Sequence, residues 1–299
     1  MDEILHFHTI RDYNNFNNNE TLHPLVSVVD LEKADEREFR RLRYDFYTVF
    51  FKKIKCGDLR YGLDYYDYEE GTLIFLAPGQ VIGENKREFY QPQGTALVFH
   101  PDLLHGTPLG SRMSDYTFFS YAVSEALHLS EQERKIIMDC FGKINYELQH
   151  TIDRHSKQLI VSNIELFLNY CQRFYDRQFI TREKVNKGVL ERFEALLDNY
   201  FLTDKPQEIG TPSVAYLADQ LNLSPNYFGD LIKKETGKSP QEYIHFKLID
   251  IAKGMIFDSN KSINEIAYAL GFKYPQHFSR FFKKAVGVSP NEYRARELN

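Results

Sequence analysis

Two stretches near the end of the chain carry apolar residues at helical spacing, and residues that start or stop helices bound each of them. In the later stretch, Ser262 and Glu265 form a capping box, which predicts the start of a helix. Its apolar face is Ile263, Ile266, Ala267 and Leu270. Gly271 follows as a helix end, Pro275 suits the first position of a second helix, and Gly287 closes that helix. The apolar face of the second helix is Phe278, Phe281, Phe282 and Ala285.

The same pattern occurs earlier in the chain. A displacement of 49 residues before the turn and 50 after it aligns the two copies, so that Pro225 matches Pro275 and Gly237 matches Gly287. One extra residue in the second turn explains the difference. We therefore predict two helix-turn-helix units in tandem, 213–236 and 262–286. A helix predicted over 240–257 and ~27 Å long joins them.

The second helix of each unit is expected to lie in a major groove of DNA. The residues expected to contact DNA are Asn226, Tyr227, Asp230, Lys233 and Lys234 in the first unit, and Gln276, His277, Ser279, Arg280, Lys283 and Lys284 in the second. Between Lys273 and Arg296, six Lys or Arg stand against one acid, Glu292. Charge alone would fit a solvated helix face, but the caps and turn favour DNA binding. Asp230 aligns with Arg280 and is repelled by phosphates, so we expect the second unit to dominate sequence choice.

The later stretch resembles a known family. The residues that carry the resemblance are Ile266, Ala267, Gly271, Phe272, the run 278–284, the run 287–290, Tyr293 and Arg294. They are similar to the signature of the AraC/XylS family of bacterial transcription regulators. The resemblance implies a sequence-specific regulator with an amino-terminal cupin-like sensor and a DNA-binding domain over 188–299. The partners it implies are double-stranded DNA, RNA polymerase, a small-molecule effector and a second copy of the chain.

Residues 24–121 are predicted to be β. The segments rich in aromatic and branched residues are 25–29, 44–54, 58–68, 72–77, 96–99 and 116–122. Two of them follow glycine and stop at proline, as in jelly-roll barrels. The predicted fold class is α+β, with a cupin-like barrel and sensor domain over 1–128. The asparagine-rich tract 14–19 is expected to be a flexible arm.

The predicted barrel has few metal ligands. His100 and His105 could supply one half of a cupin metal site, but 56–71 holds no histidine for the other half, so we predict no metal and no cofactor. An effector pocket is expected among aromatic residues, with His105 as a polar group at the barrel mouth. The candidate lining is Tyr61, Tyr65, Tyr66, Phe75 and His105. The alternative for each aromatic residue is an ordinary place in the core or at an edge.

A helical hairpin is predicted over 129–180. Its second helix has an apolar seam of Ile160, Ile164, Phe167, Cys171 and Phe174. Such a seam either packs on the barrel or joins two copies, and the family resemblance favours a homodimer. The polar segment 181–187 is expected to be a linker.

Composition places the chain among globular proteins, with 42% hydrophobic and 26% charged residues. The net charge of −5 is unevenly divided, since 209–299 holds 12 Lys or Arg against 9 Asp or Glu. That asymmetry fits a DNA-binding end. Cys56, Cys140 and Cys171 lack metal-site spacing, which suggests reduced thiols. The absence of a signal-peptide or membrane-span pattern leads us to expect a cytoplasmic protein without a membrane partner.

We therefore expect a transcription regulator and not an enzyme. One alternative is a cupin enzyme with a DNA-binding appendage, which the missing metal ligands disfavour. Another is a protein–protein adaptor, which would leave the repeated basic faces unexplained. The sequence does not identify the effector, the operator, or the direction of regulation.

Overall fold

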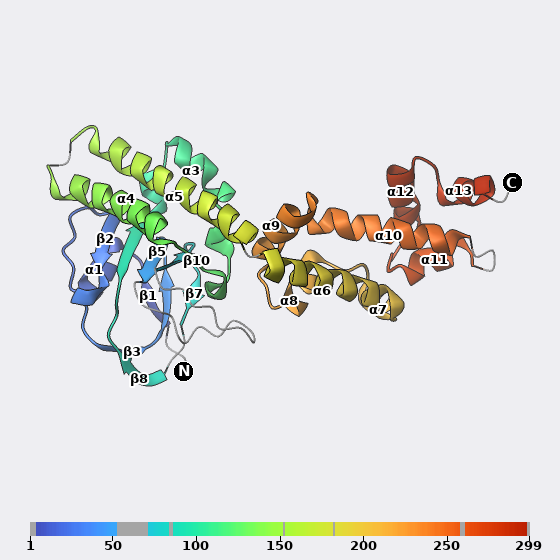
Figure 1. Cartoon of the computed structure of the whole chain (residues 1–299), viewed down its shortest axis with the longest axis horizontal. Helices are drawn as coiled ribbons and strands as arrows, with labels where there is room; N and C mark the ends of the chain where they lie inside the picture. Colours follow the sequence, from blue (N-terminus) through green and yellow to red (C-terminus); the bar gives the residue numbers. More distant parts are fainter. Residues whose placement is uncertain are drawn as a thin grey trace. The chain divides into compact units, whose positions relative to one another are not determined.

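The structure is a computed structural model, which describes residues 4–52, 71–83, 86–151, 153–181, 183–257 and 261–297. The chain forms two compact bodies, which we call the amino-terminal body (Met1–Thr181) and the carboxy-terminal body (Arg182–Asn299). Figure 1 shows β-structure with helices in the first and helices in the second. No helix in the described ranges is long and apolar enough to span a membrane.

The strands of the amino-terminal body form sheets of five, three and two strands in the part of the chain that the structure describes. Their bounds are β1 Ile4–Phe7, β2 Val26–Asp30, β3 Arg37–Phe39, β4 Arg41–Tyr44, β5 Tyr47–Lys52, β6 Thr72–Leu76, β7 Val81–Ile82, β8 Lys86–Tyr90, β9 Thr95–Phe99 and β10 Leu127–His128. The five-stranded sheet has the order β10-β6-β5-β9-β2 and is antiparallel throughout. In the three-stranded sheet, β1-β4-β7, β1 and β4 are parallel. The third sheet pairs β3 with β8.

A hydrophobic core joins the inner faces of the five- and three-stranded sheets. Ile74 and Leu76 of β6 pack with Phe7 of β1 and Tyr44 of β4, together with Val29, Ala96 and Val98. The strands expected over 25–29, 44–54, 72–77 and 96–99 are confirmed, with ends shifted by up to three residues. The strand expected over 58–68 lies outside the described residues.

The asparagine-rich tract is part of the fold, so the prediction of a flexible arm was wrong. Helix α1 (Ile10–Phe16) starts at a capping box of Thr9 with Asp12 and buries Tyr13 in the core. Asn14 and Asn17 are also buried. The Asn14 side-chain amide donates to Thr21 Oγ1 at 3.0 Å, and that of Asn17 donates to the Tyr13 carbonyl at 2.7 Å. These hydrogen bonds offset part of the cost of burying the two amides, and Asn14 Oδ1 is buried without a partner.

Helices cover the outer face of the five-stranded sheet (Figure 1). The longer ones are α4 (Glu131–Gln149), which begins at the predicted Ser130 capping box, and α5 (Ser156–Thr181). The remaining helical segments of this body are α2 Pro101–Leu104, α3 Pro108–Arg112, η1 Leu31–Lys33, η2 Met113–Asp115, η3 Thr117–Ser120 and η4 Val123–Glu125. The strand expected over 116–122 was therefore wrong. Phe118 and Phe119 are both buried against Phe75, and a short 3₁₀ helix can turn consecutive side chains towards one surface.

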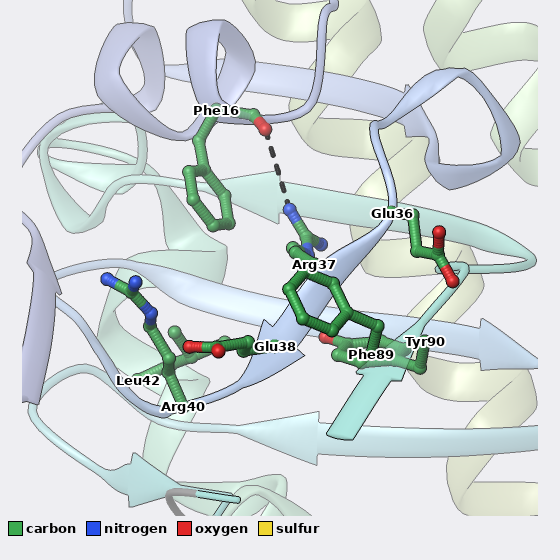
Figure 2. Close-up of a pocket in the computed structure, with 8 residues that line it drawn as sticks. All are labelled: Phe16, Glu36, Arg37, Glu38, Arg40, Leu42, Phe89 and Tyr90. Atoms are coloured by element: carbon green, nitrogen blue, oxygen red, sulfur yellow. Dashed lines mark hydrogen bonds between the residues drawn. The ribbon is translucent and has the colours of Figure 1, made fainter. Parts of the chain in front are cut away.

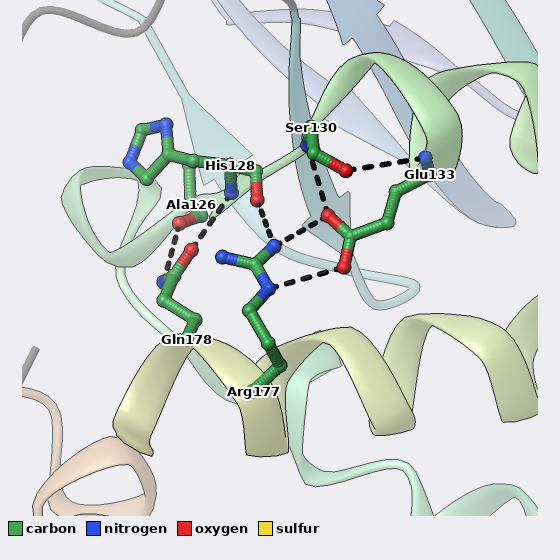
Figure 3. Close-up of polar contacts among 6 residues, drawn as sticks. All are labelled: Ala126, His128, Ser130, Glu133, Arg177 and Gln178. Carbon is green, nitrogen blue, oxygen red and sulfur yellow. Dashed lines mark hydrogen bonds and ion pairs between the residues drawn. The ribbon is translucent and has the colours of Figure 1, made fainter. Parts of the chain in front are cut away.

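A polar network anchors the last turns of α5 to the end of β10 (Figure 3). Arg177 Nη2 donates to Glu133 Oε2 at 2.6 Å and to the His128 carbonyl at 2.7 Å. The Gln178 side chain accepts from His128 N and donates to the carbonyl of Ala126, the residue before β10. Burial, with a smaller effect from the Arg177 charge, lowers the pKa of His128 to about 4. This histidine therefore stays neutral near pH 7 and is a structural group.

The carboxy-terminal body is all helical in the residues that the structure describes. Its helices are α6 Glu183–Leu202, α7 Lys205–Ile209, α8 Val214–Gln220, α9 Pro225–Thr236, α10 Pro240–Ile256, α11 Ile263–Ala269, α12 Pro275–Val286 and α13 Pro290–Glu297. The segment expected as a linker, 181–187, overlaps the last residue of α5 and the first turn of α6.

Candidate nucleic-acid interface

Two helix pairs in the carboxy-terminal body have the geometry of helix-turn-helix units. The first unit is α8 with α9, and the second is α11 with α12. Ser213 and Ser262 cap the first helices through side-chain hydrogen bonds, and Pro225 and Pro275 occupy the first positions of the second helices.

The turns of both units contain a residue in the left-handed conformation, but the residue type differs between them. Each turn needs a left-handed residue after its first helix: Asn222 takes φ 57° in the first unit and Gly271 takes φ 88° in the second. A hydrogen bond back to the helix then closes each turn, from Leu223 N to the Ala218 carbonyl at 3.0 Å and from Phe272 N to the Ala267 carbonyl at 2.9 Å. The repeated pattern in the sequence is therefore a repeated structure.

The rotation of α12 about its own axis is fixed by its buried phenylalanines. Phe278 and Phe282 are fully buried in a cluster with Ile266 of α11 and with Leu248 and Ala252 of α10. Phe281, expected on the same inner face, is half-buried and contacts His245 edge to face, with ring centroids 5.1 Å apart. The opposite side of α12 must therefore face away from the body.

That outer face carries the predicted contact residues of the second unit. Gln276, His277, Arg280, Lys283 and Lys284 are exposed, and Ser279 is half-buried. Arg294, which the charge count included, has another role. Its guanidinium donates to the Ile256 carbonyl and to the Lys261 carbonyl, each at 2.8 Å, and so ties α13 to the end of α10.

The first unit exposes fewer of the side chains that were expected to contact DNA. Asn226, Lys233 and Lys234 are exposed, and Asp230 is half-buried. Tyr227 is 6% exposed, so little of its side chain is available to read a base, and its predicted role stays a prediction. Local periodicity cannot reveal this, because the tyrosine is covered by other parts of the body.

Helix α10 connects the two units, and a close backbone contact fixes the second unit against the segment that precedes the first. Helix α10 has 17 residues, within one of the prediction, and is therefore ~26 Å long. A methyl group added to Gly271 would lie 2.6 Å from the Gly210 carbonyl carbon and 2.8 Å from the Pro206 carbonyl oxygen, so the second turn packs directly on the segment after α7. Tyr200 of α6 donates to the Gly210 carbonyl at 2.7 Å and fixes that segment.

The residues predicted for an effector pocket do not come together in the described part of the chain. Tyr61, Tyr65 and Tyr66 lie outside it. Phe75 is buried on the helix-covered face of its sheet, against Phe118 and Phe167, and so does not face the inner core where a ligand was expected. His105 is exposed, 3.5 Å from the Asp102 carboxylate.

A different cavity opens beside β3 and β8, with a volume of about 460 Å³. Its lining residues, drawn in Figure 2, are Phe16, Glu36, Arg37, Glu38, Arg40, Leu42, Phe89 and Tyr90. The Arg37 guanidinium lies 4.3 Å from the Phe16 ring centroid and donates to the Phe16 carbonyl and to Asn17 Oδ1. The Arg37 Nε is buried without a hydrogen-bond partner, and such a group favours a ligand that supplies one.

The apolar seam predicted for dimerisation is occupied within one chain. All five of its residues are buried, packed towards α4 and the sheet. These residues are therefore not available to bind a second copy of the chain. Of the two alternatives for the seam, packing within one chain agrees with their burial. The outer face of α5 instead exposes Leu159 and Leu166, at 44% and 41%.

Comparison with known proteins gives the same assignment of the carboxy-terminal body. Residues 217–296 match the family model of a helix-turn-helix domain. The chain is 37% identical over 245 residues to the MmsAB operon regulatory protein of Pseudomonas aeruginosa, which covers 77% of this chain and 76% of that protein. It is 28% identical over 130 residues to the uncharacterized HTH-type transcriptional regulator YobQ of Bacillus subtilis, covering 39% of this chain and 53% of YobQ.

The chain thus spans about half the length of YobQ and of some other curated relatives it matches. Among solved structures, the DNA-binding domain of AdpA in complex with a target DNA is similar at 23% identity, with a TM-score of 0.31. That similarity covers 36% of this chain and 90% of the AdpA chain.

Proposed function

The chain belongs to the AraC/XylS family of transcription regulators, and from this premise we propose that its carboxy-terminal body reads two neighbouring major grooves of one DNA duplex. The observation that carries the proposal is the outer face of α12. Polar and basic side chains are exposed on this face, and the opposite face of the helix is buried through its phenylalanines. Arginine can bond both acceptors of a guanine edge, and lysines neutralise phosphates. Membership of this family places the chain among regulators and not among enzymes.

The separation of the two units fits one turn of DNA. Half-sites on one face of a duplex are ~34 Å apart. Helix α10, at ~26 Å, runs from the recognition helix of the first unit, α9, to α11, which precedes the recognition helix α12 of the second. The close contact at Gly271 fixes the second unit against Pro206–Thr211, the segment that leads into the first unit. We infer that they dock as a pair, with one fixed spacing.

The second unit dominates sequence choice in this proposal. At the position of Arg280, the first unit has Asp230, which cannot form the two-pronged contact with guanine. Because Tyr227 is buried, Asn226 is the remaining predicted base-reading residue there, with Lys233 and Lys234 holding the phosphate backbone.

The amino-terminal body acts in this proposal as a cupin-like jelly-roll sensor. The two facing sheets and their common core support that assignment. We place the effector in the cavity beside β3 and β8, where Arg37 suits a small molecule with a carboxylate or another acceptor group.

The regulator is proposed to be a homodimer that pairs through the outer face of α5. Leu159 and Leu166 are seven residues apart and so lie on one side of the helix, two turns from each other. Exposed leucines at this spacing are typical of a helix that packs against a partner helix.

Replacing Arg280 tests the assignment of the DNA-contacting face. We expect Arg280→Ala to cost about 1–3 kcal/mol on a selected operator and to relax base preference in the half-site under α12. Binding of the full chain to a randomised operator library measures both effects.

Asp230→Ala is the matched control for this experiment, because it changes the equivalent position of α9. It should alter the binding free energy by under about 1 kcal/mol. Lys283→Ala should instead weaken binding to all sequences and reduce the slope of log affinity against log salt concentration by about 1, the loss of one phosphate contact. Equal base preference in the two half-sites, or a severe loss on Asp230→Ala, would contradict the proposal.

The effector site predicts ligand binding that depends on Arg37. A screen of small organic acids by thermal shift should find compounds that raise the melting temperature of the wild type but not of Arg37→Gln, which removes the charge and shortens the side chain while keeping a polar end. Arg112→Gln, on the exposed surface of α3, should respond like the wild type. Stabilisation that persists in Arg37→Gln would place the ligand elsewhere.

The dimer proposal predicts that two surface charges separate the copies. Sedimentation should show a dimer for the wild type and a folded monomer for Leu159→Lys with Leu166→Lys, because each lysine would face its counterpart across the contact. Leu202→Lys is the control: this leucine is 85% exposed but lies on α6. A monomeric wild type, or a dimeric double variant, would overturn the assignment.

A further inference from the structure

Three side chains that bind metals well meet on the outer face of the three-stranded sheet. His6 lies on β1, His8 follows two residues later, and Asp45 follows β4 directly. Strand alternation sends Phe7 into the core and the two histidines to the opposite side. The parallel register pairs Phe7 with Tyr44, and Asp45 N bonds the Phe7 carbonyl at 3.0 Å, so the carboxylate lies beside both imidazoles.

The three groups converge on a small space. His6 Nε2 lies 2.7 Å from Asp45 Oδ1, and His8 Nδ1 lies 2.8 Å from Asp45 Oδ2. The two ring centroids are 3.8 Å apart, and one ligand atom from each residue lies within 4.8 Å of the others.

We propose that His6, His8 and Asp45 bind one divalent transition-metal ion of the zinc class. Two imidazole nitrogens and one carboxylate oxygen suit zinc, cobalt, nickel or copper, whereas calcium and magnesium favour sets of oxygen ligands. Bonds of about 2.0–2.1 Å in tetrahedral geometry place ligand atoms about 3.3 Å apart. The nitrogen–oxygen distances of 2.7 and 2.8 Å would therefore open by about half an ångström, a change that side-chain rotation supplies.

A metal ion bound at this site could exchange with solvent. Three protein ligands leave a fourth position for water, as in sites that are not closed structural centres. The His8 side chain is 65% exposed and that of Asp45 is 34% exposed, so the ion can enter without opening the core. A bound ion would cross-link β1 to β4 and so fix the amino-terminal strand to its sheet. This proposal does not depend on the DNA-binding function.

Zinc titration of the metal-stripped full chain tests the proposal, under reducing conditions and in competition with a chromophoric chelator. We expect one zinc ion per chain, with a dissociation constant on the order of micromolar, because an exposed three-ligand site binds more weakly than a closed one. His6→Gln, His8→Gln and Asp45→Asn should each weaken binding at least tenfold. Zinc should also raise the melting temperature of the wild type and not of these variants.

Two controls separate this site from other zinc ligands. His155→Gln changes an exposed histidine just before α5, and Cys56→Ser removes a thiol outside the described residues; both should bind zinc like the wild type. Circular dichroism of the metal-free variants checks that they are folded, which the exposed position of His8 favours. Failure of the wild type to bind zinc, or unchanged binding in folded His8→Gln and Asp45→Asn, would overturn the proposal.

Discussion

The carboxy-terminal body depends on one close contact between backbones, that of Gly271 with the segment Pro206–Thr211. Gly271 serves two purposes there. Its left-handed conformation makes the turn between α11 and α12, and its lack of a side chain lets the turn approach the Gly210 carbonyl. The first unit makes its turn with Asn222, where only the conformation is required. The contact explains why the repeat is asymmetric at this position, and it makes the placement of α12 depend on α6 and α7.

The DNA-contacting face follows from packing around the same contact. Phe278 and Phe282 anchor α12 to α10, and this fixes which side chains face outwards. The sequence was informative here because caps, turns and helical periodicity act over a few residues. Boundaries of α8 to α12 could therefore be predicted closely. The burial of Tyr227 could not be predicted because it depends on elements distant in the chain. The same is true of the bonds from Arg294 to the Ile256 and Lys261 carbonyls, which follow from tertiary structure.

The amino-terminal body was less predictable, for physical reasons. Composition and alternation identified β2, β5, β6 and β9, which are buried and rich in branched or aromatic residues. The same cues failed for Thr117–Ser120, where adjacent phenylalanines pack together in a 3₁₀ turn. They also failed for the asparagines of α1, because hydrogen-bond partners are invisible in composition. The site of His6, His8 and Asp45 needed the parallel pairing of β1 with β4, which local pattern does not specify.

The most direct test of a fixed pair of reading helices compares Gly271→Ala with Gly287→Ala. Both glycines have φ 88°, but a methyl group on Gly287 meets nothing within 4 Å, so the difference isolates the contact with Gly210. Affinity for DNA with both half-sites is measured against affinity for each half-site alone. The account predicts that Gly271→Ala loses at least about tenfold in the two-site affinity, from strain of about 1–3 kcal/mol, while Gly287→Ala stays near the wild type. Equal two-site affinities for the two variants would contradict it.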